Sequence, residues 1–337
     1  MATTTFAASN VPASDSTDVP VSAVSRFDAL LSPRVREGVV LTLLILCWSF
    51  CSSIAYGTAR VVLRGWTFPL TLFIITLITS IAVLALLFHV IRATPQQNAP
   101  ALVSLRSSLI IAFAQSLGYV LTYVAYSKVS VPFVQIIRSA DTLITLALSV
   151  LLFGKSFPWG VYLALPPIAF GVALTSVAEA RFDALGMVLA LTSTVCFVLR
   201  AVITKDTLRP LDAFNVFDYL SKLSLALTVP FWLFLEAPQL FFNATPLTPL
   251  LGGVSAELYD HAHPVAWLAG TALAKTPAVV FMSPVFLGKL CLVAVPFALY
   301  NIASYVVLMR VSALTHSVCN VMRRAVLIIS KYVTLLT

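Results

Sequence analysis

Three arginines lie inside apolar stretches of the sequence, where a cation needs a partner. Arg138 lies between Ser130 and Gly154 among isoleucines and leucines, and Arg323 and Arg324 lie side by side within LTHSVCNVMRRAVLI. A charged side chain at the centre of a bilayer costs about 2.5–3.5 kcal/mol on insertion scales, so each guanidinium should face a polar cavity, an anion or a carboxylate. Its planar fork of donors matches phosphate or carboxylate oxygens. Together the three arginines predict a site for a dianionic head group.

Simpler explanations exist for each of these charges. Asp141 lies three residues after Arg138 on the same helical face, so the two could form an ion pair, or Asp141 could orient Arg138 for a ligand. Arg323 and Arg324 repel each other and have no carboxylate within helical reach. They could extend to one membrane face as interfacial anchors. Because they lie about ten residues into their apolar run, we expect instead that an anion visits them.

Hydroxyl and amide groups occur in two other apolar runs. Tyr119 and Thr122 are three residues apart and share one helical face, and Tyr300 is followed directly by Asn301. These side chains could hydrogen-bond the rest of an anionic ligand. Each of them could equally serve helix packing.

The composition requires the helices that carry these residues to lie in a membrane. Of 337 residues, 60% are hydrophobic and 10% are charged, whereas soluble domains have roughly 45–50% apolar and about 25% charged residues. We therefore expect an all-α polytopic membrane protein, with the lipid bilayer as one partner and no sizeable soluble catalytic domain. The net charge of +8 fits the positive-inside bias of membrane proteins, and no nucleic acid partner is expected.

Turn and charge signals separate nine apolar runs. Residues 1–36 should be disordered, and one long loop is expected at 237–283, where His261 and His263 lack a third metal ligand. The five cysteines read as small buried hydrophobes. Neither a metal nor a cofactor is predicted. We place transmembrane helices near 38–60, 68–91, 107–127, 130–153, 158–178, 184–204, 212–236, 284–309 and 313–335.

A weak internal repeat links the two ends of the chain. KVS at 128–130 matches RVS at 310–312, an offset of 182 residues. At the same offset GY at 118–119 aligns with YN at 300–301. Duplicated halves with polar residues at equivalent depth are typical of secondary transporters, whose site lies at the repeat interface.

At these residues the sequence resembles the plastidic phosphate translocators, the triose-phosphate translocator branch of the drug/metabolite transporter superfamily. The last of the matching segments is the most specific, because its Thr-His-Ser-Val is followed by an asparagine and a basic pair. The segments are KVSVPFVQIIRSADTLI (128–144), GKSFPWGVYLALPPIAFGVALTSVAEARFDALG (154–186), CFVLRAVITK (196–205), LDAFNVFDYLSKLSL (211–225) and ALYNIASYVVLMRVSALTHSVCNVMRRAVLI (298–328).

The resemblance implies two inverted five-helix halves, here expected at 38–180 and 184–337 with the tenth helix missing. It also implies strict exchange of inorganic phosphate for phosphorylated three-, five- or six-carbon metabolites across a plastid membrane, non-green and secondary plastids included. Triose phosphate, 3-phosphoglycerate and phosphoenolpyruvate are the favoured substrates. The family's phosphate-binding lysine of the fourth helix and Lys-Arg pair of the ninth fall on Arg138, Arg323 and Arg324.

Several other positions of the family pattern also have counterparts in this sequence. The threonine of the third helix and the tyrosine of the eighth fall on Thr122 and Tyr300, where they would contact substrate. Two departures concern family histidines, which Tyr119 and Gln135 replace here. The basic residues Arg200 and Lys205 match positions after the sixth helix, in a loop where a gating or structural role is as fitting as binding.

The function expected from the sequence is antiport by alternating access. An empty site would hold like charges that resist closure, so that only the loaded protein could change its orientation. A nucleotide-sugar antiporter of the Golgi or endoplasmic reticulum is one alternative, and a non-transporting membrane scaffold or receptor is another. An enzyme is not expected, because no Ser/His/Asp, Cys/His or metal-ligand group occurs at helical spacing. The oligomeric state stays open.

Overall fold

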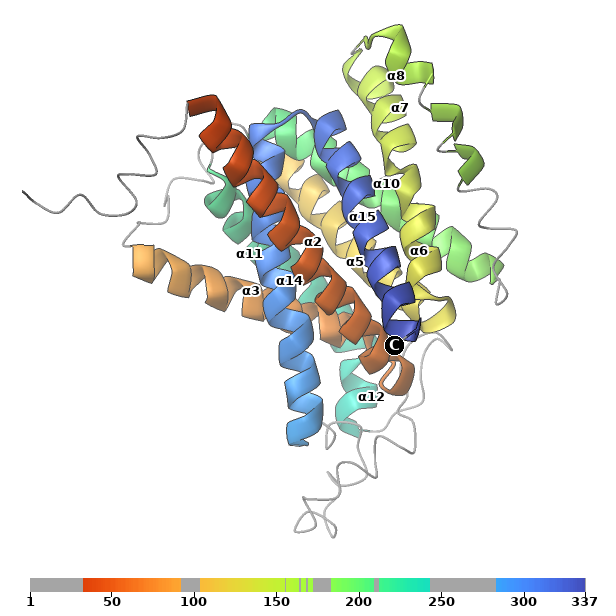
Figure 1. Ribbon diagram of the computed structural model, residues 1–337. Helices are drawn as coiled ribbons and strands as arrows, with labels where there is room; N and C mark the ends of the chain where they lie inside the picture. Colours follow the sequence, from red (N-terminus) through yellow and green to blue (C-terminus); the bar gives the residue numbers. More distant parts are fainter. Residues whose placement is uncertain are drawn as a thin grey trace, which may run out of the picture. The chain divides into compact units, whose positions relative to one another are not determined.

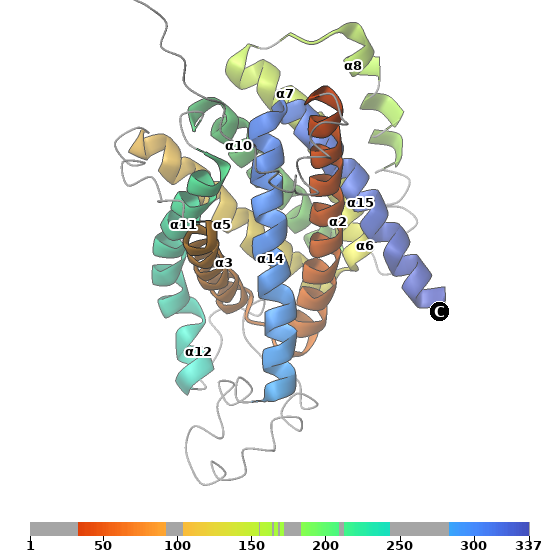
Figure 2. The same ribbon diagram turned by 60° about the vertical axis from the view of Figure 1, so that its left-hand side comes forward.

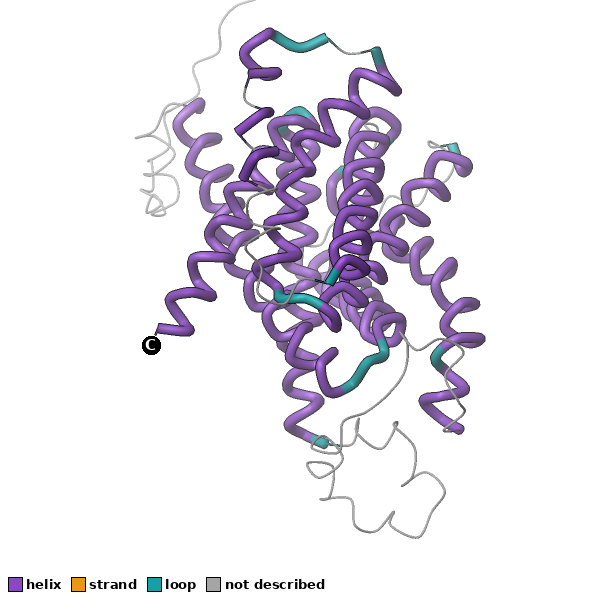
Figure 3. Tube along the Cα trace, turned by 90° about the vertical axis from the view of Figure 1, so that its right-hand side faces the viewer, coloured by secondary structure: helices purple, strands orange, loops and turns teal. Residues whose placement is uncertain are grey.

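The computed structural model describes residues 33–91, 104–154, 156–163, 165–167, 169–171, 183–208, 212–242 and 283–336. It divides the chain into two units, 1–42 and 43–337, and every contact discussed below lies within the second. Figure 3 shows that the described elements are helices joined by short loops. The first 32 residues of the segment predicted to be disordered lie outside the described residues, as do His261 and His263.

The helices coincide with the predicted apolar runs, apart from the run 158–178, which is described only in part. The first helix is longer than predicted at both ends. It begins at Pro33, so residues 33–36 of the segment predicted to be disordered are helical, and it continues through Arg60 and Arg64. The loop predicted at 237–283 begins with a short helix. The elements are α2 (Pro33–Gly65), α3 (Pro69–Ile91), α5 (Leu105–Lys128), α6 (Val131–Ile137), η1 (Arg138–Ala140), α7 (Asp141–Phe153), α8 (Trp159–Leu163), α10 (Ala184–Thr207), α11 (Ala213–Leu235), α12 (Ala237–Phe242), α14 (Pro284–Arg310) and α15 (Ala313–Leu336).

Length and composition make this a polytopic membrane protein, as predicted. Among the described residues, α2, α3, α5, the α6–α7 series, α10 and α14 are long and apolar enough to cross a bilayer. The helix α15 has 24 residues, which is long enough for a span. It is not one of the helices just named, and it carries two charges, Arg323 and Arg324. The total of nine spans stays a prediction.

The fourth apolar run is not one continuous helix. A 3₁₀ turn, η1, interrupts it at Arg138–Ala140, and the N–H of Asp141 donates to the carbonyl of Arg138. Interrupted helices near the middle of a span are where transporters build their binding sites. The sequence did not reveal this break, because none of the three residues in the turn is glycine or proline.

Two helix junctions have the same backbone geometry at the predicted repeat offset. Val129, between α5 and α6, has φ −125° and ψ 169°, and Val311, between α14 and α15, has φ −115° and ψ 170°. After each valine a serine hydroxyl accepts from the N–H three residues on, at 3.3 Å for Ser130 and 3.1 Å for Ser312. The two junctions are alike in these respects, and the duplication of the two halves stays a prediction.

Close packing of α5 against α10 depends on two glycines (Figure 1). A Cβ at Gly186 would lie 2.7 Å from Cγ1 of Val129, so no larger residue fits there without a shift. A Cβ at Gly118 would lie 3.2 Å from the ring of Phe197. The second contact brings Phe197 to the inner face of α5, where it reaches the site.

The helix α3 lies between α11 and α14 (Figure 2). Its first turn is held by Glu236, a fully buried residue in the turn after α11, whose carboxylate accepts from the N–H groups of Leu70 and Thr71 at 2.8 and 2.7 Å. Farther along α3, the ring of Phe73 stacks on Tyr119 at 5.3 Å. By holding α3, Glu236 therefore helps to position Tyr119, one of the candidate site residues.

Candidate functional site

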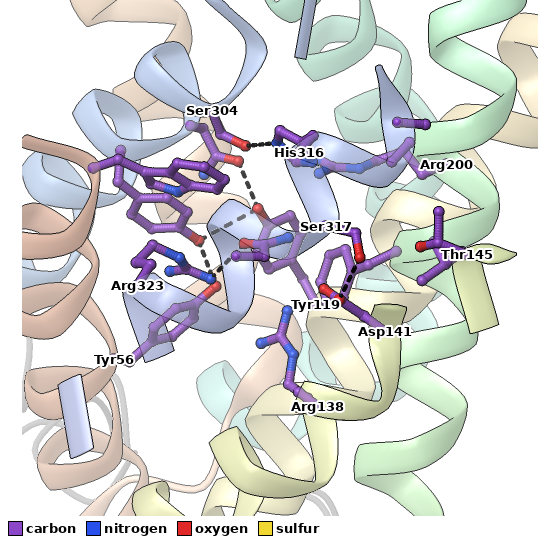
Figure 4. Close-up of a pocket in the computed structure, with 18 residues that line it drawn as sticks. Tyr56, Tyr119, Arg138, Asp141, Thr145, Arg200, Ser304, His316, Ser317 and Arg323 are labelled. Carbon is purple, nitrogen blue, oxygen red and sulfur yellow. Dashed lines mark hydrogen bonds between the residues drawn. The ribbon is translucent and has the colours of Figure 1, made fainter. Parts of the chain in front are cut away.

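A cavity inside the second unit collects residues from α2, α5, η1, α7, α10, α14 and α15 (Figure 4). The arginines in its wall are Arg138, Arg200 and Arg323, and the acidic residue is Asp141. Five aromatic residues also line the cavity, namely Trp48, Tyr56, Tyr119, Phe197 and Tyr300.

The three cavity arginines are buried and have donors without a partner. Their exposed fractions are 4% for Arg138, 7% for Arg200 and 3% for Arg323. The Nε and Nη1 atoms of Arg138 and Arg323, and Nε of Arg200, are buried and have no hydrogen-bond acceptor. A buried cationic donor without an acceptor is costly. An anion in the cavity would supply the missing acceptors.

Aromatic rings, rather than carboxylates, contact the guanidinium groups of the cavity. The Cζ atom of Arg138 lies 4.6 Å from the centre of the Phe197 ring, and that of Arg200 lies 5.5 Å from the same ring. The Cζ atom of Arg323 lies 5.0 Å from the centre of the Trp48 ring and 6.0 Å from that of the Tyr300 ring. Cation–π contacts stabilise a charge without neutralising it, so the cavity stays positive.

Arg324, which the sequence analysis grouped with Arg138 and Arg323, does not line this cavity. Its Nη2 forms an ion pair with Oδ2 of Asp141 at 2.7 Å, and its Nη1 donates to the carbonyl oxygen of Arg138. Ser317 donates to the other carboxylate oxygen of Asp141 at 3.0 Å. Asp141 therefore pairs with Arg324, which is distant in the sequence, instead of with Arg138. The sequence analysis did not find this partner, because it considered only residues within a few positions on the same helix.

Arg200 and Lys205 both lie within α10, so their predicted place in a loop is wrong. The Nη1 atom of Arg200 donates to Oε1 of Gln115 at 3.4 Å and to the hydroxyl of Tyr305 at 3.3 Å. The Tyr305 hydroxyl donates to the same Gln115 oxygen at 2.8 Å. This network orients the Arg200 side chain while Nε stays without an acceptor.

Three residues predicted from the sequence meet in one hydrogen-bonded group. Tyr119 donates to Oδ1 of Asn301 at 2.6 Å, and these are residues at the repeat offset of 182. The Tyr300 hydroxyl lies 3.3 Å from that of Tyr119 and donates to that of Tyr56 at 3.0 Å. The group places hydroxyls from three helices in the cavity wall.

Three other predicted residues do not line the cavity. Thr122 is fully buried and donates to the carbonyl of Gly118 in its own helix at 2.8 Å, so its hydroxyl is already used. Gln135 donates to Tyr126 at 2.6 Å. Lys205 donates to the carbonyl of Met309 at 2.7 Å, which joins α10 to α14.

Sequence reasoning missed the aromatic part of the site. Trp48, Tyr56 and Phe197 line the cavity, but in an apolar sequence such residues read as core. His316 also lines it, stacked on Trp48 at 5.0 Å and hydrogen-bonded to Ser304 at 3.1 Å. One signal was available, because Trp48 and Tyr56 are eight residues apart and lie near one face of a helix.

The fold and the cavity together define a polytopic membrane protein with a buried cavity lined by three arginines. The chain belongs to the Triose-phosphate Transporter family, whose model matches residues 39–337. This confirms the family predicted from the sequence.

Curated relatives agree with the family match. The chain is 31% identical over 218 residues to the "Triose phosphate/phosphate translocator, chloroplastic" of Flaveria pringlei, which covers 65% of this chain and 46% of that protein. It is 31% identical over 227 residues to the "Glucose-6-phosphate/phosphate translocator 1, chloroplastic" of Arabidopsis thaliana, covering 66% and 50%. A longer match, 26% over 291 residues, is to the Brassica oleracea triose phosphate/phosphate translocator and covers 86% and 64%. The chain thus spans about half the length of the first two.

Proposed function

We propose that this protein is a secondary antiporter of a plastid membrane that exchanges inorganic phosphate for phosphorylated metabolites by alternating access. The observation that carries the proposal is the set of buried guanidinium donors without acceptors at Arg138, Arg200 and Arg323. They converge on one cavity. The names of the relatives, which are translocators of phosphate, triose phosphate and glucose 6-phosphate, support the same substrate class.

The phosphate group would bind between η1 and α15. Arg138 and Arg323 supply the unpaired donors there, and both contact the ring of Tyr56, at 5.7 and 5.8 Å. Arg200, which contacts the same Phe197 ring as Arg138, would meet a second polar or anionic group of the same ligand. A short phosphorylated three-carbon acid fits this arrangement of charges.

Exchange, rather than release of substrate without return, follows from the charge of the empty cavity. Three buried cations without a counter-ion repel one another, and closing the two halves around them would remove the remaining solvent. A bound dianion supplies both the missing charge and a bridge between the halves. Only the occupied protein should therefore close and reopen on the other side.

Counter-exchange in proteoliposomes tests the proposal. Vesicles preloaded with phosphate should take up labelled phosphate, while vesicles without internal phosphate should not. Triose phosphate, 3-phosphoglycerate and phosphoenolpyruvate should compete for uptake. Exchange of a nucleotide sugar against its monophosphate, with no phosphate exchange, would contradict the proposal and move the protein to the Golgi type of antiporter. Absence of any exchange or anion binding would favour a scaffold or receptor.

A further inference from the structure

Tyr56 is the cavity residue whose ring contacts both arginines that would bind phosphate. It lies on α2 and is 2% exposed. The Cζ atom of Arg138 lies 5.7 Å from the centre of its ring and that of Arg323 lies 5.8 Å from it. Figure 4 shows the Tyr56 side chain in the cavity next to Arg323. A single ring from the first helix is thus shared by cations from η1 and α15.

Two like charges sharing one cavity need a group that keeps them at a fixed spacing. A carboxylate would do this by neutralising them, but it would also compete with an anionic ligand. The face of an aromatic ring is negative enough to attract a guanidinium and carries no net charge. The Tyr56 ring can therefore hold Arg138 and Arg323 and still leave their N–H donors to a ligand.

Neighbouring tyrosines fix the position of the ring. The hydroxyl of Tyr300, on α14, donates to the Tyr56 hydroxyl at 3.0 Å. The ring itself packs on Tyr300 at 5.4 Å and on Tyr126, from α5, at 5.8 Å. The ring makes these packing contacts, and the hydroxyl adds two hydrogen bonds, one from Tyr300 and one from the Arg138 guanidinium.

We infer that Tyr56 is a positioning residue of the phosphate site, whose ring sets the spacing of Arg138 and Arg323. This inference rests on the proposed phosphate exchange. The inference assigns this role to the ring and not to the hydroxyl. Phe keeps the ring and can replace Tyr56 in this role, whereas Leu cannot. The inference also requires that Tyr56 acts through the guanidinium groups.

The test compares Tyr56→Phe and Tyr56→Leu with Tyr123→Leu, which removes a fully buried tyrosine ring outside the cavity lining. Each variant is assayed for the KM and Vmax of phosphate counter-exchange and for the phosphate-dependent rise of the unfolding temperature in detergent. Tyr56→Leu should raise KM about tenfold or more, and Tyr56→Phe no more than about threefold. Tyr123→Leu should lower the unfolding temperature and leave KM unchanged.

A double-mutant cycle with Arg323→Lys separates positioning from packing. Lysine keeps the charge but lacks the planar group that lies on the ring, so the effect of Tyr56→Leu on KM should be smaller in that background. The effect of Tyr123→Leu on stability should be the same in both backgrounds.

Distinct outcomes overturn the inference and the proposed function. A wild-type KM in Tyr56→Leu, equal damage by Phe and Leu, or full additivity with Arg323→Lys would each overturn the role of the Tyr56 ring. If wild-type protein binds phosphate in the unfolding assay without exchanging it, the proposed antiport fails and the same variants still test the ring. If wild-type protein neither binds nor exchanges phosphate, both are wrong.

Discussion

Arg323 and Arg324 are neighbours on α15, both are buried and both have an Nε without an acceptor, yet the partners of their guanidinium groups differ. Arg323 lies against the rings of Trp48 and Tyr56, with Nε and Nη1 lacking an acceptor and only Nη2 bonded, to Asn320 at 3.0 Å. Arg324 pairs with Asp141 at 2.7 Å, and its exposed fraction of 2% matches the 3% of Arg323.

The difference teaches how a membrane protein can use one kind of residue in two ways. A buried arginine paired with a carboxylate is part of the framework, because removing its partner leaves an unpaired charge in a low dielectric. A buried arginine on aromatic rings keeps its charge and its donors for a ligand. Here Arg324, which is paired with Asp141, also donates to the carbonyl of Arg138. The ion pair therefore directly supports one of the arginines of the cavity.

The largest effect should come from breaking the ion pair between Asp141 and Arg324, which with Ser317 forms the paired cluster. Asp141→Asn leaves Arg324 buried without its counter-ion, and such a loss typically costs about 3–5 kcal/mol of stability. Thermal unfolding of the purified protein measures it. The double variant Asp141→Asn with Arg324→Gln removes both charges and should recover much of the loss. A double variant that is less stable than Asp141→Asn would show that the two residues are not coupled as the ion pair requires.

Removing the unpaired charge should act on transport instead. Arg323→Gln takes away donors of the bound anion, worth about 1.5–3 kcal/mol for hydrogen bonds to a charged group, or roughly ten- to a hundredfold in the KM for phosphate. Stability should stay within about 1 kcal/mol of wild type, because no carboxylate is left unpaired. Strict exchange with unaltered KM in this variant would remove Arg323 from the site.

The comparison also shows which parts of the site the sequence could predict. Arg138 and Arg323 were identifiable because a cation within an apolar run needs an anion or a cavity. The partner of Arg324 was not, since Asp141 lies on another helix and becomes its neighbour only through the packing of α7 on α15. The 3₁₀ turn at Arg138 was hidden for a related reason. No residue in it breaks helices, so tertiary contacts decide it.

Aromatic residues set the other limit of the sequence analysis. In a chain with 60% hydrophobic residues, a tyrosine or phenylalanine such as Tyr56 or Phe197 can lie in a cavity wall or in the core, and its residue type does not tell which. Helix positions were predictable from hydropathy, as α3, α5 and α14 show. The contacts between helices depend on shapes such as the approach allowed by Gly118, and a single sequence carries no direct signal for them.

A smaller change within the paired cluster sharpens the same comparison. Ser317 contacts Oδ1 of Asp141 at 3.0 Å and Oγ1 of Thr142 at 2.9 Å. Ser317→Ala removes this support but leaves the ion pair, so stability should fall by about 1 kcal/mol. The KM for phosphate should change less than in Arg323→Gln, because every arginine donor remains. Urea or thermal unfolding and exchange kinetics on the same preparation measure both effects. A KM change as large as that of Arg323→Gln would contradict a framework role for Ser317.

The smallest effect should come from Arg200, whose surroundings combine both types of support. Tyr305→Phe removes a hydroxyl that accepts from Arg200 at 3.3 Å but keeps the ring, which lies 5.1 Å from the Cζ atom of Arg200. Gln115 still accepts from the guanidinium. The variant loses two hydrogen bonds of this hydroxyl, the long one that it accepts from Arg200 and the one that it donates to Oε1 of Gln115 at 2.8 Å. Only the first contacts the guanidinium directly, so the effect should be about 0.5 kcal/mol, or roughly twofold in the KM for substrate. Tyr305→Leu, which also removes the ring, should have the larger effect, and the ratio of the two KM values gives the share that the aromatic face contributes. Equal effects of Phe and Leu would mean that the hydroxyl alone orients Arg200, and the contrast between paired and ring-supported arginines would not extend to this position.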